Sequence, residues 1–163
     1  MRNIVRGIAA GMGMTMDPTK RVLVVDDDKD VRDILYSVLQ QRGIHADSAT
    51  NGREALELIA QHPYVVVVLD LMMPEIDGFG VLETLQASGA MPVVLVLTAA
   101  DHALTDRLDP SLIHGIIRKP FDPQEIADVV AACADIRGKG MFETMALAAM
   151  LAGGPLVTFF SRY

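Results

Sequence analysis

The stretch Val65–Gly78, VVVVLDLMMPEIDG, decides the fold of this chain. Four valines and a leucine lead without a polar residue into Asp70, and a proline follows at position 74. A short run that is apolar at every position is typical of a strand buried on both faces of a parallel sheet. Because a carboxylate at the end of such a strand is costly to desolvate, the rest of the sequence should supply partners for Asp70.

Strand signals, most of them apolar runs but mixed with polar residues at 44–48, recur from Arg21 to Ile136 and alternate with helix signals. The expected strands are 22–25, 44–48, 64–69, 93–97 and 115–118. Apolar residues at helical spacing predict a helix after each strand, with capping residues at Asn51 and Asp122, each followed three residues later by a glutamate. The fourth helix, around 103–108, should be short because Asp109-Pro110 interrupts it. This alternation predicts an α/β fold with a parallel sheet covered by helices on both faces.

The composition bounds the class of protein. With 163 residues, 51% of them apolar and 21% charged, the chain can form one globular domain with some surplus. A net charge of -7 argues against a nucleic-acid-binding module, which normally carries a basic face. The single cysteine, Cys133, rules out an intrachain disulfide and fits a reducing compartment such as the cytoplasm; we interpret it as a buried packing residue.

Polar side chains gather where the predicted strands end. In parallel sheets with this winding, ligands bind beyond the carboxyl ends of the strands. The residues at those ends are Asp26, Asp27, Asp70, Thr98 and Lys119. Asp28 also follows the first strand, and we assign it to the loop or to the cap of the next helix.

This set of side chains fits phosphate chemistry. Clustered carboxylates repel one another, and a hard cation such as Mg²⁺ relieves that repulsion while leaving room for a phosphate. A threonine hydroxyl and a lysine ammonium, Thr98 and Lys119, suit phosphoryl oxygens, and Asp70 could act as the nucleophile. Each residue alone is explained as well by a helix cap, a surface charge or a hydroxyl bonded to the backbone. The matching set at four strand ends favours the functional interpretation.

Four segments, VLVVDDD, VVVVLDLMMPEIDG, VLVLTAA and IIRKPF, resemble bacterial response regulator receiver domains. The resemblance covers about Lys20 to Ile136. It implies a flavodoxin-like fold, a five-stranded parallel sheet in the order 2-1-3-4-5 with helices on both faces. It also implies that a histidine kinase or a histidine phosphotransfer protein donates the phosphoryl group.

The resemblance assigns roles to individual residues. Asp70 would be the phosphoacceptor, with Thr98 and Lys119 contacting the phosphoryl oxygens. The magnesium ligands would be Asp26, Asp27, Asp70 and the backbone carbonyl of Met72. One departure is Ile116, which stands three residues before the lysine, where receivers often carry an aromatic ring that moves on activation. The segment LDPSLIHG also lacks the usual Gly-Ala pair.

We therefore expect a single-domain response regulator that signals by changed protein binding. It would not be an enzyme beyond self-phosphorylation and slow self-dephosphorylation. One alternative is a receiver-like scaffold that works without phosphate, although the intact acid, threonine and lysine set argues against it. Another is a phosphatase acting through an aspartyl phosphate, but such enzymes usually carry a second acid where this chain has Met72. The four histidines, at positions 45, 62, 102 and 114, are expected on the surface.

The two ends of the chain lie outside the predicted domain of residues 20–136. Residues 1–19 are expected to form a flexible leader. Residues 137–163 are expected to form a hinge and an apolar tail that packs on its own receiver, on a second copy or on a membrane. We favour association through the tail, such as a homodimer, because exposed apolar segments usually mark contacts. Its few cationic groups argue against the membrane.

Overall fold

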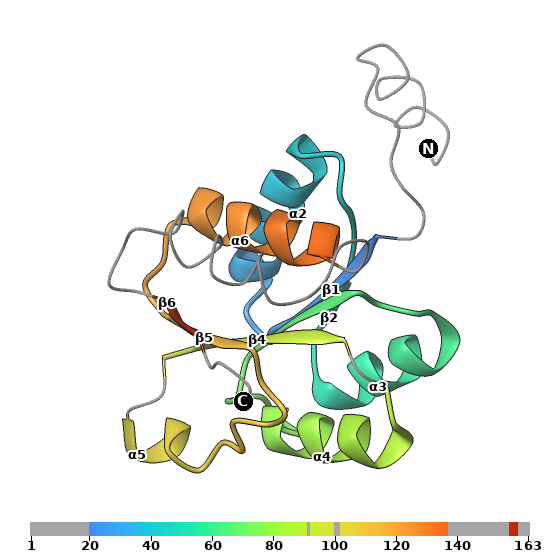
Figure 1. Cartoon of the computed structure of the whole chain (residues 1–163), viewed down its shortest axis with the longest axis vertical. Coiled ribbons are helices and arrows are strands. Elements are labelled where there is room, and N and C mark those ends of the chain that lie inside the picture. Colours follow the sequence, from blue (N-terminus) through green and yellow to red (C-terminus); the bar gives the residue numbers. More distant parts are fainter. Residues whose placement is uncertain (1–19, 91, 100–101, 137–156, 160–163) are drawn as a thin grey trace.

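The computed structural model describes residues 20–90, 92–99, 102–136 and 157–159. Within this part, six strands form one sheet in the order β2-β1-β3-β4-β5-β6 (Figure 1). Their bounds are β1 Arg21–Val25, β2 His45–Ala49, β3 Val66–Leu69, β4 Val93–Thr98, β5 Gly115–Arg118 and β6 Val157–Phe159. The first five strands are parallel, so the flavodoxin-like fold and the order 2-1-3-4-5 are confirmed. The sixth strand was not predicted.

Helices cover both faces of the sheet, as expected. Their bounds are α2 Lys29–Gln41, α3 Gly52–Gln61, α4 Gly78–Ser88, α5 His102–Thr105 and α6 Pro123–Ile136. The helices α2 and α6 pack together on one face, and α3 and α4 pack together on the other (Figure 1). The helix α5 is a single turn, shorter even than the interrupted helix that the sequence predicts.

The strands β1, β3, β4 and β5 are apolar at almost every position because they separate two cores, whereas the edge strand β2 is mostly polar. Residues 22 and 24 of β1 face the core beneath α2 and α6, together with Leu35 and Val130. Residues 23 and 25 face the core beneath α3 and α4, together with Val81 and Leu85. All four β1 residues are at most 1% exposed, which fixes the strand between the two layers.

Side-chain caps start the helices where the sequence predicts. Asp28, Asn51 and Asp122 each accept a hydrogen bond from a backbone N–H in the first turn of the following helix, at 2.8–2.9 Å. The capping box at α3 differs from the prediction. The Glu54 carboxylate accepts from the N–H and the hydroxyl of Thr50, at 2.7 and 2.8 Å, one residue before the Asn51 cap.

Several expectations for single residues are settled by burial. Cys133 is 2% exposed, and burial raises the pKa of its thiol to about 11, so the packing interpretation is confirmed. The expectation that all the histidines lie on the surface is wrong. His45 is partly buried, and so is His114, whose Nδ1 accepts a hydrogen bond from the N–H of Val94 at 3.1 Å.

The strand β6 pairs antiparallel with β5, opposite Gly115, Ile116 and Ile117. This part of the apolar tail therefore lies on its own receiver, which is the first of the three alternatives for the tail. The predicted leader, residues 1–19, and the rest of the predicted hinge and tail fall outside the described residues. Among the helices that the structure describes, none is long and apolar enough to cross a membrane.

Candidate functional site

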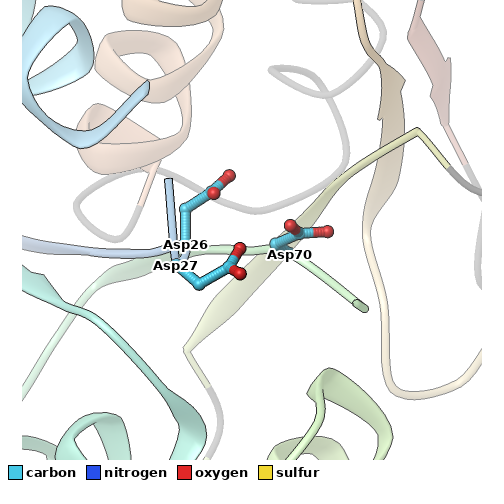
Figure 2. A group of neighbouring side chains, drawn as sticks. All are labelled: Asp26, Asp27 and Asp70. Atoms are coloured by element: carbon cyan, nitrogen blue, oxygen red, sulfur yellow. The ribbon is translucent and has the colours of Figure 1, made fainter. Parts of the chain in front are cut away.

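Strand register brings the predicted acids together at one edge of the sheet. Val25 of β1 pairs with Leu69 of β3, so the next residues, Asp26 and Asp70, leave the sheet side by side. The N–H of Asp70 still donates to the carbonyl of Val25 at 2.9 Å, which ties the two strand ends together. Figure 2 shows the carboxylates of Asp26, Asp27 and Asp70 emerging next to one another from these two strands.

The three carboxylates can share one cation. One oxygen from each of Asp26, Asp27 and Asp70 lies within 4.8 Å of the others. Asp26 and Asp70 are buried, at 1% and 5% exposure, while Asp27 is exposed. Hard oxygen ligands with one side open to water fit Mg²⁺, which keeps several waters and binds through few carboxylates. Within the part of the chain that the structure describes, this is the one such group of acids or histidines.

Lys119 lies between two of the acids. Its Nζ donates to Asp26 Oδ2 at 2.6 Å and to Asp70 Oδ2 at 3.2 Å. The lysine reaches this place because β5 pairs with β4, and its backbone N–H donates to the carbonyl of Thr98 at 3.0 Å. The acids are thus paired with an ammonium, as the cost of burying a carboxylate requires.

The remaining predicted residues lie at the same edge. Thr98 ends β4 and is fully buried. Met72 places its backbone N–H 3.2 Å from Asp70 Oδ1 and leaves its side chain outside, at 60% exposure. The role of the Met72 carbonyl as a metal ligand stays a prediction. Asp28 is the cap of α2, as expected, and its own N–H donates to Asp26 Oδ1 at 2.9 Å.

Burial and neighbouring charges act against each other on the two central ionisable groups. Burial raises the pKa of the Asp70 carboxyl and the nearby Asp26 adds to the rise, while the Met72 N–H and Lys119 reduce it without cancelling it. Burial lowers the pKa of the Lys119 ammonium, but its contacts with Asp26 and Asp70 outweigh that effect and hold the pKa above its usual range. Lys119 is therefore charged at neutral pH.

Two supports of the site were missed by sequence reasoning. Arg32 on α2 donates to backbone carbonyls of the acid-bearing turn. Gly78, at the start of α4, lies so close to the end of β3 that an added Cβ would stand 2.5 Å from the carbonyl oxygen of Asp70. A sequence signal existed for each: an arginine one helical turn past the acids, and a glycine at the first position of a helix.

The comparison with protein families agrees with this geometry. The family described as the response regulator receiver domain matches residues 22–131, which is more than half of the chain. The chain therefore belongs to the response regulator receiver domain family, and its fold is that of a receiver in two-component signalling.

Individual relatives and a solved structure agree with the family. Response regulator MprA of Mycolicibacterium vanbaalenii is 48% identical over 81 residues, 50% of this chain and 35% of MprA. Transcriptional regulatory protein SrrA of Staphylococcus aureus is 32% identical over 110 residues, 66% of this chain and 45% of SrrA. The structure of TrrA from Thermotoga maritima in complex with Mg²⁺-BeF is 33% identical, with a TM-score of 0.62, over 70% of this chain and 98% of TrrA. The chain spans about half or less of the length of the curated relatives it matches.

Proposed function

We propose that Asp70 accepts a phosphoryl group from a histidine kinase or a histidine phosphotransfer protein, and that this modification changes which proteins the receiver binds. The ligands for Mg²⁺ would be Asp26, Asp27, Asp70 and the carbonyl of Met72. The phosphoryl oxygens would contact Thr98 and Lys119. The solved relative TrrA carries Mg²⁺-BeF, which supports a metal-assisted phosphate site in a receiver of this kind.

The observation that carries the proposal is the placement of Lys119 between Asp26 and Asp70. A solvated surface lysine, the bland interpretation, would not be held 2.6 Å from a carboxylate that is 1% exposed. This contact joins β5 to the ends of β1 and β3, far apart in the sequence. An ammonium fixed beside the nucleophile is the group that developing phosphoryl charge needs.

The transfer step balances at the atoms of Asp70. A carboxylate oxygen of Asp70 forms a bond to phosphorus while the bond between phosphorus and the donor imidazole nitrogen breaks. The electron pair stays on that nitrogen, which takes up a proton, and Asp70 becomes an acyl phosphate. When bound, Mg²⁺ would neutralise charge on the transferring group. The hydrogen bond from the Met72 N–H to Oδ1 orients the carboxylate beforehand.

The proposed reactions and partners are those of the receiver domain itself. We propose no reaction on a separate substrate, only self-phosphorylation and slow self-dephosphorylation, in the cytoplasm. SrrA is named a transcriptional regulatory protein, but this acidic chain, with a net charge of -7, matches less than half of SrrA. We keep the prediction that this receiver binds protein partners and no nucleic acid. Its description as a single-domain regulator also stays a prediction.

The test is phosphorylation of the full chain by acetyl phosphate, a small phosphodonor, in the presence of Mg²⁺. Intact mass should show the gain of one phosphoryl group in the wild type and none in Asp70→Asn. The matched control is Asp33→Asn, because Asp33 is an exposed acid on α2 outside the group of three. No gain in the wild type, or an equal gain in Asp70→Asn, would reject the proposal.

A further inference from the structure

The backbone of the turn between β1 and α2 accepts hydrogen bonds from one side chain on α2. Arg32, on the first turn of α2, donates from Nη1 to the carbonyl oxygen of Asp26 at 2.7 Å and to that of Asp27 at 2.9 Å. A guanidinium Nη carries two hydrogens, so a single nitrogen can serve both carbonyls. The backbone N–H of Arg32 donates to the carbonyl of Asp28 at 3.2 Å, which anchors the arginine to the same turn.

The two acids on this turn are held in different ways. The Asp26 side chain is fixed directly, by Lys119 on one oxygen and by the N–H of Asp28 on the other. The Asp27 side chain is exposed, and among the described residues its carboxylate accepts no hydrogen bond. Its direction is therefore set by its backbone, and Arg32 is the side chain that fixes the peptide groups on either side of the Asp27 Cα.

We propose that Arg32 is a positioning residue for the magnesium site, acting through the backbone of Asp26 and Asp27. The inference rests on the proposed function, since it presupposes that these acids bind Mg²⁺. Arg32 would not touch the metal. It would hold the Asp27 carboxylate, the one exposed acid, in the direction of the other two before the ion arrives, so that binding does not have to order the turn.

Charge and positioning predict opposite effects for this residue. By charge alone, a guanidinium on the turn that carries the acids repels a divalent cation, so removal of Arg32 should tighten Mg²⁺ binding. By positioning, removal frees the two carbonyls and the Asp27 backbone, so binding should weaken. The sign of the change in affinity decides between the two effects.

Lys29 supplies a matched control on the same helix. It also carries a positive charge in the first turn of α2, but its ammonium pairs with the exposed Asp33 one turn further along. Lys29→Met and Arg32→Met each remove one positive charge and leave a side chain of similar apolar length. Arg32→Lys keeps the charge and offers an ammonium with hydrogens for one or both carbonyls.

The experiment is calorimetric titration of Mg²⁺ into the full chain, in the wild type and the three variants. Arg32→Met should bind about tenfold more weakly, which is the usual effect of losing an outer-shell partner. Lys29→Met should stay within about twofold of the wild type, because an exposed charge is screened by salt. Arg32→Lys should fall between the wild type and Arg32→Met.

A second measurement separates positioning from a loss of structure. Phosphorylation by acetyl phosphate is followed as Mg²⁺ is raised. In Arg32→Met the half-saturating Mg²⁺ concentration should rise about tenfold while the rate at saturation stays near that of the wild type. Should Arg32→Met fail to fold, the same comparison between wild type and Arg32→Lys decides, with a smaller shift in the same direction.

Three outcomes would overturn the inference. Arg32→Met that binds Mg²⁺ as tightly as the wild type, or more tightly, shows that charge and not positioning dominates. An equal loss in Lys29→Met shows an effect of helix charge. A wild type that binds no Mg²⁺ removes the proposed metal site and this inference together, whereas the first two outcomes leave the proposed function standing.

Discussion

The carboxyl-end edge of the sheet and its β5 side are built in opposite ways. The strands β1, β3 and β4 are buried on both faces, and each is followed by or ends in a polar residue of the site. These residues are Asp26 after β1, Asp70 after β3 and Thr98 at the end of β4. Lys119 joins these ends through side-chain contacts of 2.6 and 3.2 Å. At the β5 side, β6 pairs through its backbone with Gly115, Ile116 and Ile117.

This difference indicates which part of the receiver can change at low cost. To move Asp26 or Asp70, the protein must disturb strands packed in both cores, or leave a buried carboxylate without its ammonium. The described contacts of β6, by comparison, are the backbone pairings of a three-residue strand with β5. We call the carboxyl-end edge, with Asp26, Asp70, Thr98 and Lys119, the chemical edge, and the pairing of β6 with β5 the side edge. We therefore expect a rigid chemical edge and a labile side edge. The strand β5, which ends just before Lys119, belongs to both.

The largest expected effect is on the chemical edge. Asp27→Ala should weaken Mg²⁺ binding by about 100-fold or more, since even outer-shell partners cost about 10–100-fold when removed. Calorimetric titration measures this, with Asp33→Ala as the control that removes an equal charge outside the cluster. Equal affinity in wild type and Asp27→Ala would remove Asp27 from the site.

Acidification should act in the same direction on the wild type. Protonated carboxylates are poor ligands, so the Mg²⁺ affinity should fall as the pH falls. Because burial raises the pKa of Asp70, the fall should begin at a higher pH than for an ordinary aspartate. An affinity that is constant down to the usual pKa of an aspartate would contradict the assignment of Asp70 as a ligand.

The next largest effect should come from the close backbone contact beneath Asp70. In Gly78→Ala the new Cβ would meet the Asp70 carbonyl oxygen at 2.5 Å and the Leu71 Cα at 2.8 Å, and backbone atoms cannot move aside easily. We expect a loss of about 1–3 kcal/mol of stability and a lower rate of phosphorylation at saturating Mg²⁺. Denaturant unfolding and intact mass would measure the two effects.

Gly89→Ala is the control for that change. Gly89 has a φ of 71°, so alanine is strained there, but no atom lies within 4 Å of the added Cβ. This variant should lose about 1 kcal/mol of stability and keep the wild-type rate of phosphorylation. A comparable loss of rate in both variants would mean that general destabilisation, and not displacement of Asp70, slows the reaction.

The chemical edge was predictable from sequence because its signals are local and repeated. The strands β1, β3, β4 and β5 are apolar almost to their ends, and the winding of the fold sends those ends to one edge, so Asp26, Asp70, Thr98 and Lys119 could be grouped without coordinates. What could not be predicted is support that depends on tertiary contact. The bonds from Arg32 to two carbonyls and the approach of Gly78 to Asp70 have no periodic signature.

The strand β6 at the β5 side was not predicted, for a related reason. The tail is rich in methionine and alanine, and although Val157, Thr158 and Phe159 all favour strands, three residues are too few to predict a strand or its partner. Its pairing is decided by the exposed edge of β5, which lies about 40 residues earlier. His114 shows the same limit, since its partly buried hydrogen bond with Val94 joins residues 20 positions apart, which no spacing rule connects.

A truncation after Lys139 tests whether the side edge is labile and whether the tail joins copies. We expect the full chain to associate at high concentration and the truncated chain to stay monomeric, as light scattering would show over a wide concentration range. Association would also make the melting temperature of the full chain depend on concentration. If the full chain is monomeric throughout and truncation only lowers the melting temperature, the tail is a cover for β5 and the homodimer is wrong.

The smallest effect should be on the lifetime of the phosphoryl group, and it concerns the open face of the chemical edge. Met72 lies two residues beyond Asp70, and its side chain is 60% exposed next to this nucleophile. Ala100 lies two residues beyond Thr98 and is outside the described residues. Neither side chain can orient a water for in-line attack on phosphorus, so one aid to hydrolysis is missing and the acyl phosphate should be comparatively long-lived.

In Met72→Asn/Ala100→Glu, loss of phosphate should accelerate by about threefold to tenfold, well below the 10²–10⁴ of a fully positioned general base. The measurement is the decay of the phosphorylated mass after removal of the donor, at saturating Mg²⁺, with Met72→Leu as the apolar control. An unchanged rate of decay in the polar double variant would mean that Lys119 and the bound metal, the groups already fixed around Asp70, set the lifetime of the acyl phosphate. The side chains at positions 72 and 100 would then not affect hydrolysis.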